Sequence, residues 1–196
     1  MAAFIKDVIS IFKLRIGVAI MLSAVAGMAI VPGPSPEMWR AALVAFAVLL
    51  ASASAGAFNQ WAEADLDRKM ARTAHRPFAA GRFRADVSWL VAIASLLFVA
   101  VVLAAVIANA EAAFHTFMGA FVYGVVYTLW LKRRSVANIV FGGLAGSFAV
   151  LAGAAAVEPG LGVEALILAT VLFLWTPPHF WSLAIAERDA YAGASV

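Results

Sequence analysis

Residues Trp39–Phe58 read WRAALVAFAVLLASASAGAF, a run of 20 residues whose only charge is Arg40. A helix needs about 20 mostly apolar residues to cross the hydrocarbon core of a bilayer. The whole chain has the same character, since 65% of its 196 residues are hydrophobic and 13% are charged. A soluble domain is about half apolar and about a quarter charged. The stretch and the composition therefore predict an integral membrane protein built from helices.

Six segments are long and apolar enough to span a membrane. They cover approximately Leu14–Val31, Trp39–Phe58, Trp89–Ala108, Ala112–Leu131, Ile139–Val157 and Ala165–Ala186. Turn-forming stretches such as PGPSP at 32–36 and EPGLG at 158–162 separate them, because proline and glycine interrupt helices. The expected fold is all-α, a polytopic transmembrane helix bundle that forms a single domain over residues 1–196. The amphipathic stretch FIKDVISIFKLR at 4–15 is expected to lie at the interface before the first span.

Lysine and arginine are distributed unequally between the two ends of this bundle. With six spans, 13 of the 14 lysines and arginines fall on the side of the N-terminus, the 61–88 and 132–138 loops and the C-terminal tail, and only Arg40 falls on the other. Cytoplasmic loops of membrane proteins are rich in these residues, so this side is expected to be cytoplasmic. The net charge of +3 does not indicate a nucleic-acid partner, and the absence of cysteine excludes disulfides and thiol chemistry.

The stretch NQWAEADLDRKMARTAHRPFAAGR at 59–82 follows the second span and is highly charged. Asn59, Glu63 and Asp67 are spaced four residues apart, which places them on one face of a helix. Carboxylates are costly to hold near hydrocarbon, so a cation is expected to compensate them. Oxygen ligands without nitrogen or sulfur suit Mg²⁺, which commonly bridges carboxylates to substrate phosphates.

Arginines follow these acids closely, at Arg72, Arg76 and Arg82. Guanidinium groups bind phosphate oxygens through paired hydrogen bonds, so acids, Mg²⁺ and arginines together indicate a diphosphate site. The alternative for the arginines is an ordinary cytoplasmic loop that follows the positive-inside rule. That rule does not account for carboxylates at helical spacing.

The end of the last span reads LFLWTPPHFWSLAIAERDAYAG at 172–193, and it repeats the acidic pattern more weakly. Glu187 and Asp189 emerge on the same side as Asp67, where two acid-bearing helix ends could hold two magnesium ions around one diphosphate. Pro177 and Pro178 are expected to kink the span or to impose an irregular backbone. Such a kink would point His179 into the bundle, as a functional group or as a packing histidine.

The pattern N-x-x-x-E-x-D-x-D at 59–67, followed by M-x-R-T-x-x-R-P-x-x-x-G-R at 70–82, resembles the UbiA superfamily of intramembrane prenyltransferases. The stretches YTLWLKRRSVANIVFGGLAG at 127–146, WTPPHFWSLA at 175–184 and RDAYAGA at 188–194 are most similar to its haem-farnesylating branch. The resemblance covers nearly the whole chain. Members of the family usually have about nine spans, against six here, and they often carry an acid or polar residue where this chain has Ala190.

The resemblance implies Mg²⁺-dependent transfer of a farnesyl group from farnesyl diphosphate to a vinyl group of haem b, giving haem O for cytochrome oxidase. It implies catalytic roles for five residues: Asn59, Glu63, Asp67, Arg72 and Arg76. It implies diphosphate binding by Arg72, Arg76, Lys132 and Arg133, in addition to Arg82, and metal binding by Asn59, Glu63, Asp67, Glu187 and Asp189. His179 is the expected haem ligand. Aromatic faces that could stabilise a farnesyl cation are Trp61, Phe121, Tyr123, Tyr127 and Trp175.

The expected setting is a bacterial inner membrane, with possible association with cytochrome oxidase assembly proteins. Three alternatives remain: a UbiA-type enzyme with a quinone-precursor or chlorin acceptor, an inactive bundle, and a cation transporter. A transporter would need ionisable residues along a path through the membrane, whereas nearly all the charges here lie at one end.

Overall fold

The computed structural model describes residues 2–34, 36–132, 134–135 and 137–186, and all the regular structure among these residues is helical. The helices, in chain order, are α1 (Ala2–Ile11), α2 (Leu14–Ile30), α3 (Met38–Ala62), α4 (Ala64–Asp67), α5 (Val87–Ile107), α6 (Ala110–Phe121), the π-helix η1 (Val122–Leu131), α7 (Asn138–Val157) and α8 (Val163–Ala186). The all-α fold predicted from composition is therefore confirmed.

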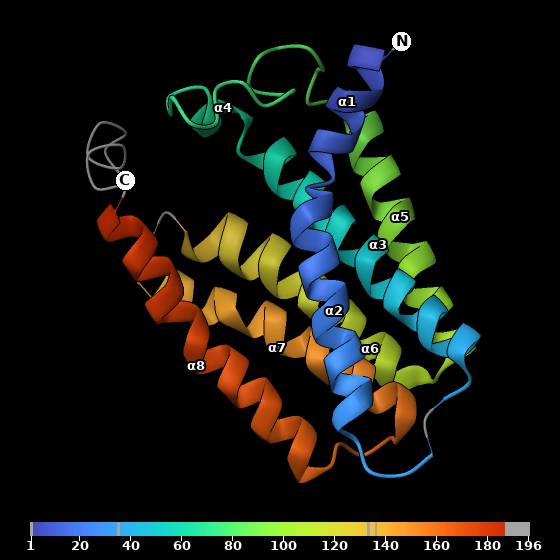
Figure 1. Cartoon of the computed structure of the whole chain (residues 1–196). Helices are drawn as coiled ribbons and strands as arrows, with labels where there is room; N and C mark the ends of the chain where they lie inside the picture. The colour runs from blue at the N-terminus through green and yellow to red at the C-terminus, as the bar shows by residue number, and fades with distance from the viewer. Residues whose placement is uncertain (1, 35, 133, 136, 187–196) are drawn as a thin grey trace.

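The long helices run back and forth between two ends of the bundle (Figure 1). The N-terminus, α4 with the loop that follows it, and the end of α8 lie at one end in Figure 1. The connections α2–α3, α5–α6 and α7–α8 lie at the other. This is the alternation that six spans require, and it brings the predicted site stretches to the same end.

Five of the described helical segments are long and apolar enough to cross a membrane: Met38–Ala62, Val87–Ile107, Ala110–Leu131, Asn138–Val157 and Val163–Ser182. A sixth span arises if α1 and α2, which meet at a bend of 42°, are taken together. The bend separates the amphipathic N-terminal stretch from the apolar α2, as expected for an interfacial helix followed by a span.

Small residues allow α2 and α7 to pack backbone to backbone. A β-carbon on Gly27 would collide with the carbonyl oxygen of Val150, and one on Gly153 would collide with that of Ala24. Helices in lipid associate through such close approaches, because there is no hydrophobic driving force between them. The glycine-rich sequence of α7 is therefore a packing surface.

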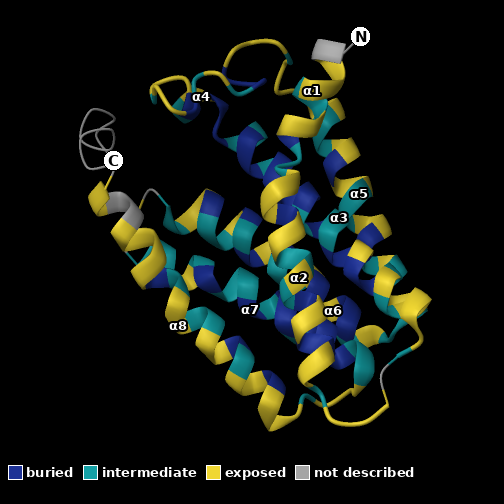
Figure 2. Cartoon of the chain, in the orientation of Figure 1, coloured by how far each residue is buried: buried dark blue, intermediate teal, exposed yellow. Residues whose placement is uncertain are grey.

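Burial is concentrated in the middle of the bundle, on α3, α6 and α7, whereas α5 and α8 lie at its margins (Figure 2). The helix α8 continues through Pro177 and Pro178 without an irregular segment. His115, on α6, is 7% exposed and stacks on Phe148 with the ring centroids 5.8 Å apart.

The fourth span differs from the uniform α-helix expected from its sequence. It begins as α6 and continues as η1, a π-helix of 10 residues. π-Helical turns are uncommon and occur frequently at functional sites. Here the wider turn carries Tyr123, Tyr127 and Thr128 and ends beside Lys132, close to the acidic end of α3.

Candidate active site

Asn59, Glu63 and Asp67 lie on successive turns where α3 passes into α4. The α-helix ends at Ala62, but the backbone N–H of Glu63 still donates to the Asn59 carbonyl at 3.0 Å, and that of Asp67 donates to the Glu63 carbonyl at 2.8 Å. These are helical i to i−4 hydrogen bonds, so the spacing of four residues still corresponds to about one helical turn across the break. All three side chains are buried, with residue exposures of 2–3%.

Glu63 is held by Lys132, which follows η1. The Lys132 Nζ atom donates to Oε2 of Glu63 at 2.7 Å and lies 2.6 Å from Oε1, to which it makes no well-aligned hydrogen bond. Asn59 Nδ2 also donates to Oε2, at 2.8 Å. A buried carboxylate needs such partners, because an unpaired charge away from water is strongly unfavourable.

Asp67 is paired in the same way with Arg76. One terminal nitrogen of Arg76 donates to both carboxylate oxygens of Asp67, at 2.9 and 2.8 Å. The Thr73 hydroxyl donates to the Asp67 carbonyl at 3.1 Å and ties the intervening turn to the same residue. The arginine predicted to bind phosphate therefore lies beside the predicted metal ligand, in the relationship that a diphosphate site requires.

Asn59 is linked to two residues that the sequence interpretation did not assign to the site, Lys13 and Thr128. Lys13 Nζ donates to Asn59 Oδ1, and Asn59 Nδ2 donates to Thr128 Oγ1 at 3.1 Å. Lys13 has a left-handed backbone, with φ 49° and ψ 44°, between α1 and α2. This conformation is unfavourable for a residue with a β-carbon, and it occurs where the lysine reaches the acidic cluster. The alternation of spans already placed Lys13 at this end, and that was the available signal.

Two tyrosines of η1 flank this cluster. The rings of Tyr123 and Tyr127 stack with their centroids 5.5 Å apart. Lys13 Nζ lies 3.5 Å from the Tyr123 hydroxyl, and Lys132 Nζ lies 5.7 Å from the centre of the Tyr127 ring. Of the five aromatic candidates, these two lie at the site. Trp61 donates instead to the Asp86 carbonyl, Phe121 stacks on Phe117, and Trp175 stacks on His179.

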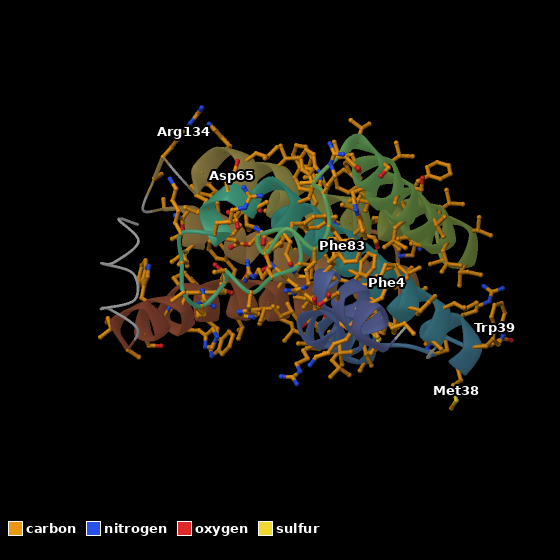
Figure 3. All side chains as sticks on the ribbon, turned by 90° about the horizontal axis from the view of Figure 1, so that it is seen from above. Phe4, Met38, Trp39, Asp65, Phe83 and Arg134 are labelled. Atoms are coloured by element: carbon orange, nitrogen blue, oxygen red, sulfur yellow. The ribbon has the colours of Figure 1, made fainter. Side chains whose placement is uncertain are left out.

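The loop after α4 folds back over α1. Arg82 donates to Asp7 Oδ2 at 2.8 Å and to the His75 carbonyl at 2.7 Å, so it joins the loop to α1 rather than to the acids. Phe83 and Phe4, labelled in Figure 3, also pack against each other, with the ring centroids 5.6 Å apart. Arg72 is exposed and makes no ion pair with any residue that the structure describes.

The structure describes only some residues of the second half of the predicted site. Arg133, Glu187 and Asp189 lie outside the described residues. His179 is exposed and stacks on Trp175, with the ring centroids 4.4 Å apart, so the expectation that it points into the bundle is wrong for this chain. The reason is that α8 continues as a helix through the two prolines and keeps His179 on the face that carries Trp175.

The cluster suits a divalent cation that is shared with an anionic ligand. Within the described part of the chain, no three histidine, aspartate or glutamate side chains are grouped so that they could hold a metal by themselves. The oxygens of Asn59, Glu63 and Asp67 are nevertheless hard donors, and each residue already faces a side-chain nitrogen, of Lys13, Lys132 and Arg76 respectively. Mg²⁺ commonly uses one or two carboxylates and completes its shell with water and phosphate, so the donor set fits.

The charges of this cluster distinguish it from a transport path. Glu63 and Asp67 are the buried carboxylates among the described residues, and both lie at the end of the bundle that carries α4. The other buried polar side chains are amides, hydroxyls and His115. Buried carboxylates confined to one end of the bundle do not line a path through the membrane, as a transporter would require.

The chain belongs to the UbiA prenyltransferase family, whose model matches residues 20–196. It is 58% identical, over all of its length and 68% of the relative's, to protoheme IX farnesyltransferase 2 of Paramagnetospirillum magneticum. It is 43% identical to protoheme IX farnesyltransferase 1 of the same organism, over 97% of this chain and 67% of the relative. The corresponding enzyme of Paracoccus denitrificans is 38% identical, over 97% of this chain and 62% of that protein.

The fold is also similar to a solved structure, a UbiA homologue from Archaeoglobus fulgidus bound to GPP and Mg²⁺. The TM-score is 0.79 at 15% identity, over 96% of this chain and 66% of that one. At this identity the likeness supports the fold. The chain spans about two thirds of the length of these relatives.

Proposed function

We propose that this chain carries the prenyl-diphosphate site of a protoheme IX farnesyltransferase, which transfers a farnesyl group from farnesyl diphosphate to a vinyl group of haem b. The observation that carries the proposal is the 58% identity to a relative of that name along the whole of this chain. The buried acid and base cluster at the end of α3 supports it, because both signs of charge are needed to bind a metal-complexed diphosphate.

The donor site is formed by Asn59, Glu63 and Asp67. These residues would hold Mg²⁺, and Glu187 and Asp189 are proposed to hold a second ion from the end of the last span. When bound, magnesium neutralises part of the diphosphate charge and thereby favours departure of that group. The carboxylates lie between lysine and arginine side chains, so an arriving diphosphate meets both its metal and its cations in one place.

Lys132, Arg76 and Lys13 supply positive charge close to where the diphosphate would lie. Arg72, Arg82 and Arg133 are proposed as further phosphate partners, and Arg72 has an exposed guanidinium that is free of ion pairs with the described residues. As the C–O bond of the allylic diphosphate breaks, the electron pair stays on oxygen. Preorganised cations stabilise the charge that develops there, and such stabilisation is usually the largest contribution to catalysis.

The farnesyl cation then needs protection from water and an aromatic surface. The stacked rings of Tyr123 and Tyr127 lie next to the cluster, and aromatic faces attract cations. The vinyl π electrons of the acceptor form the new C–C bond, and water adds to the resulting cation with loss of a proton. His179 is proposed as the haem ligand, from the exposed face of α8.

The proposed setting is a bacterial inner membrane, with α4 and the acidic cluster on the cytoplasmic side. The relatives are bacterial enzymes, and the lysines and arginines are concentrated at that end. Association with cytochrome oxidase assembly proteins is part of the same proposal, because haem O is consumed in that oxidase.

The experiment is extraction and chromatography of haems from membranes that contain this chain and are supplied with haem b, farnesyl diphosphate and Mg²⁺. We expect a haem O peak that disappears with a chelator and in Asp67→Ala. The matched control is Asp65→Ala, because Asp65 belongs to the same turn but is exposed and pairs with Arg68. The proposal would be contradicted by a haem O peak that is unchanged in Asp67→Ala. It would also be contradicted if this chain gave no haem O while a Paramagnetospirillum relative, assayed in parallel, did.

A further inference from the structure

A polar pocket lies beside the acidic cluster, between α1 and the loop at 75–82. Its volume is about 680 Å³, within the range of small-molecule sites. The lining side chains that matter here are those of Lys6, Lys13, Gln60, His75, Arg76 and Arg82. Asp7 is the one carboxylate among the described residues that line it, so the pocket is strongly basic.

Two of the basic groups of this pocket are already paired with acids, Arg76 with Asp67 and Arg82 with Asp7. Asp7 accepts from Arg82 Nε, and the bond from Arg82 to the His75 carbonyl uses a second nitrogen. Lys6 makes no ion pair with any described residue. An excess of cations around a cavity attracts anionic ligands.

Gln60 is a buried amide in the wall of this pocket. The residue is 2% exposed, and its Nε2 donates to the carbonyls of Ser10 and Ile11, at 2.8 and 3.1 Å. Those two bonds fix the orientation of the amide, because only the NH₂ group can donate. Its Oε1 atom is buried and has no hydrogen-bond partner in the described structure.

The pocket shares two walls with the acidic cluster. Arg76 lines the pocket and binds Asp67, and Lys13 lines it and binds Asn59. A ligand in the pocket would therefore be separated from the proposed diphosphate site by these two side chains. The contacts Arg82–Asp7 and Phe83–Phe4 hold α1 against the loop and keep the pocket in shape.

We infer that this pocket binds the carboxylate edge of the acceptor, an inference that rests on the proposed function. A porphyrin such as haem b carries two propionates on the edge opposite its vinyl groups. At least one of these propionates would face Lys6, a pocket lysine that makes no ion pair with a described residue. The same chemistry could be offered by the phosphate and hydroxyls of an anionic lipid headgroup, and the experiment separates these sources.

The test compares binding of haem b and of its dimethyl ester, which lacks both carboxylates, to the purified full chain by titration of the Soret band. We expect wild type to bind haem about tenfold more tightly than the ester, and Lys6→Glu to abolish this preference. The matched control is Lys69→Glu, which makes the same charge change on an exposed lysine outside the pocket. Because the readout is a ratio, partial unfolding of a variant does not imitate the effect.

The inference would be overturned if wild type bound haem b and its dimethyl ester equally, or if the preference for haem b over the ester survived in Lys6→Glu. It would also fall if vesicles containing phosphatidylglycerol, but not porphyrin, bound in a manner that depends on Lys6. If haem O formation persists while any of these results holds, the proposed function stands without this pocket. If wild type neither binds haem nor forms haem O, the proposed function falls with it.

Discussion

Lys132 and Glu63 are 69 residues apart in the chain, yet the lysine Nζ atom lies 2.7 Å from Glu63 Oε2. The contact joins the end of the π-helix to the end of α3, and Glu63 is only 2% exposed. The ion pair thus connects two spans at a position where the carboxylate is buried away from water. It follows that the site is assembled by tertiary pairing, and each partner depends on the other.

Replacement of Lys132 by methionine should lower the free energy of unfolding by roughly 3–5 kcal/mol, because it leaves the Glu63 charge buried without its cation. The measurement is unfolding in mixed micelles, followed by helical circular dichroism. Combining Lys132→Met with Glu63→Gln should restore much of the loss, since the charge is then absent. The surface control is Asp65→Asn, whose exposed pair with Arg68 should change stability by less than about 1 kcal/mol. Equal losses in the double and the single variant would contradict this account.

Alanine at Gly153 should destabilise the bundle, since its methyl group would meet the Ala24 carbonyl and force α2 and α7 apart. We expect a loss of roughly 1–3 kcal/mol, the usual range for overpacking. Gly146→Ala is the matched control on the same helix, because its added methyl would reach Leu172 at an ordinary 3.4 Å. A thermal melt in detergent that is unchanged by Gly153→Ala would mean that the two helices can separate without cost.

The approximate positions of the spans in the chain were predictable because hydrophobic length indicates a membrane helix. The common face of Asn59, Glu63 and Asp67 was equally predictable, since helical spacing survives the break at Ala62. The partners of these acids were less accessible. Lys13 reaches Asn59 only through the bend between α1 and α2, a tertiary feature that leaves no periodic signal.

The π-helix and the position of His179 could not be read from the sequence. An apolar run has the same hydropathy whether its hydrogen bonds are α or π in pattern, so Val122–Leu131 looked like the rest of its span. The prolines before His179 suggested a break, but α8 continues through them, and the histidine lies on an exposed face. The helix-breaking tendency of the two prolines therefore did not interrupt α8.

Asp86 should give the stability of the protein a pH dependence at the start of α5. The Ser88 hydroxyl donates to Asp86 Oδ1 at 2.6 Å and, as the largest cause, lowers the pKa of this carboxyl below its ordinary value. A group whose pKa is lower in the folded state stabilises the protein at pH values above its unfolded pKa, which is about 4 for aspartate. That contribution disappears as the pH falls through the lower, folded value.

Asp86→Ala should therefore lower the melting temperature at neutral pH, and the difference from wild type should shrink as the pH falls below about 4. Asp86→Asn is the matched control, because an amide oxygen can still cap the helix but does not titrate. Its melting temperature relative to Asp86→Ala should not depend on pH. A difference between wild type and Asp86→Ala that persists unchanged into acid would rule out the carboxylate as its source.

Thr128 connects the π-helix η1 to Asn59 on α3. Its buried hydroxyl accepts from Asn59 Nδ2 at 3.1 Å and donates to the Tyr123 carbonyl at 2.8 Å. Valine has the same shape without the hydroxyl, so Thr128→Val should cost roughly 1–3 kcal/mol of stability by leaving two buried polar groups with fewer partners. It should also reduce prenyl transfer, because Asn59 loses one of the contacts that orient it.

Serine at position 128 keeps the hydroxyl and should retain most of the activity. The comparison separates the effect of the hydrogen bonds from the effect of the methyl group. The decisive measurement is the Mg²⁺ concentration for half-maximal diphosphate release, compared between Thr128→Val and Thr128→Ser. If Asn59 is a metal ligand held in place by Thr128, the valine variant should need more Mg²⁺ while the serine variant does not. Equal Mg²⁺ requirements, with only stability changed, would assign Thr128 to the packing of the π-helix and would remove it from the site.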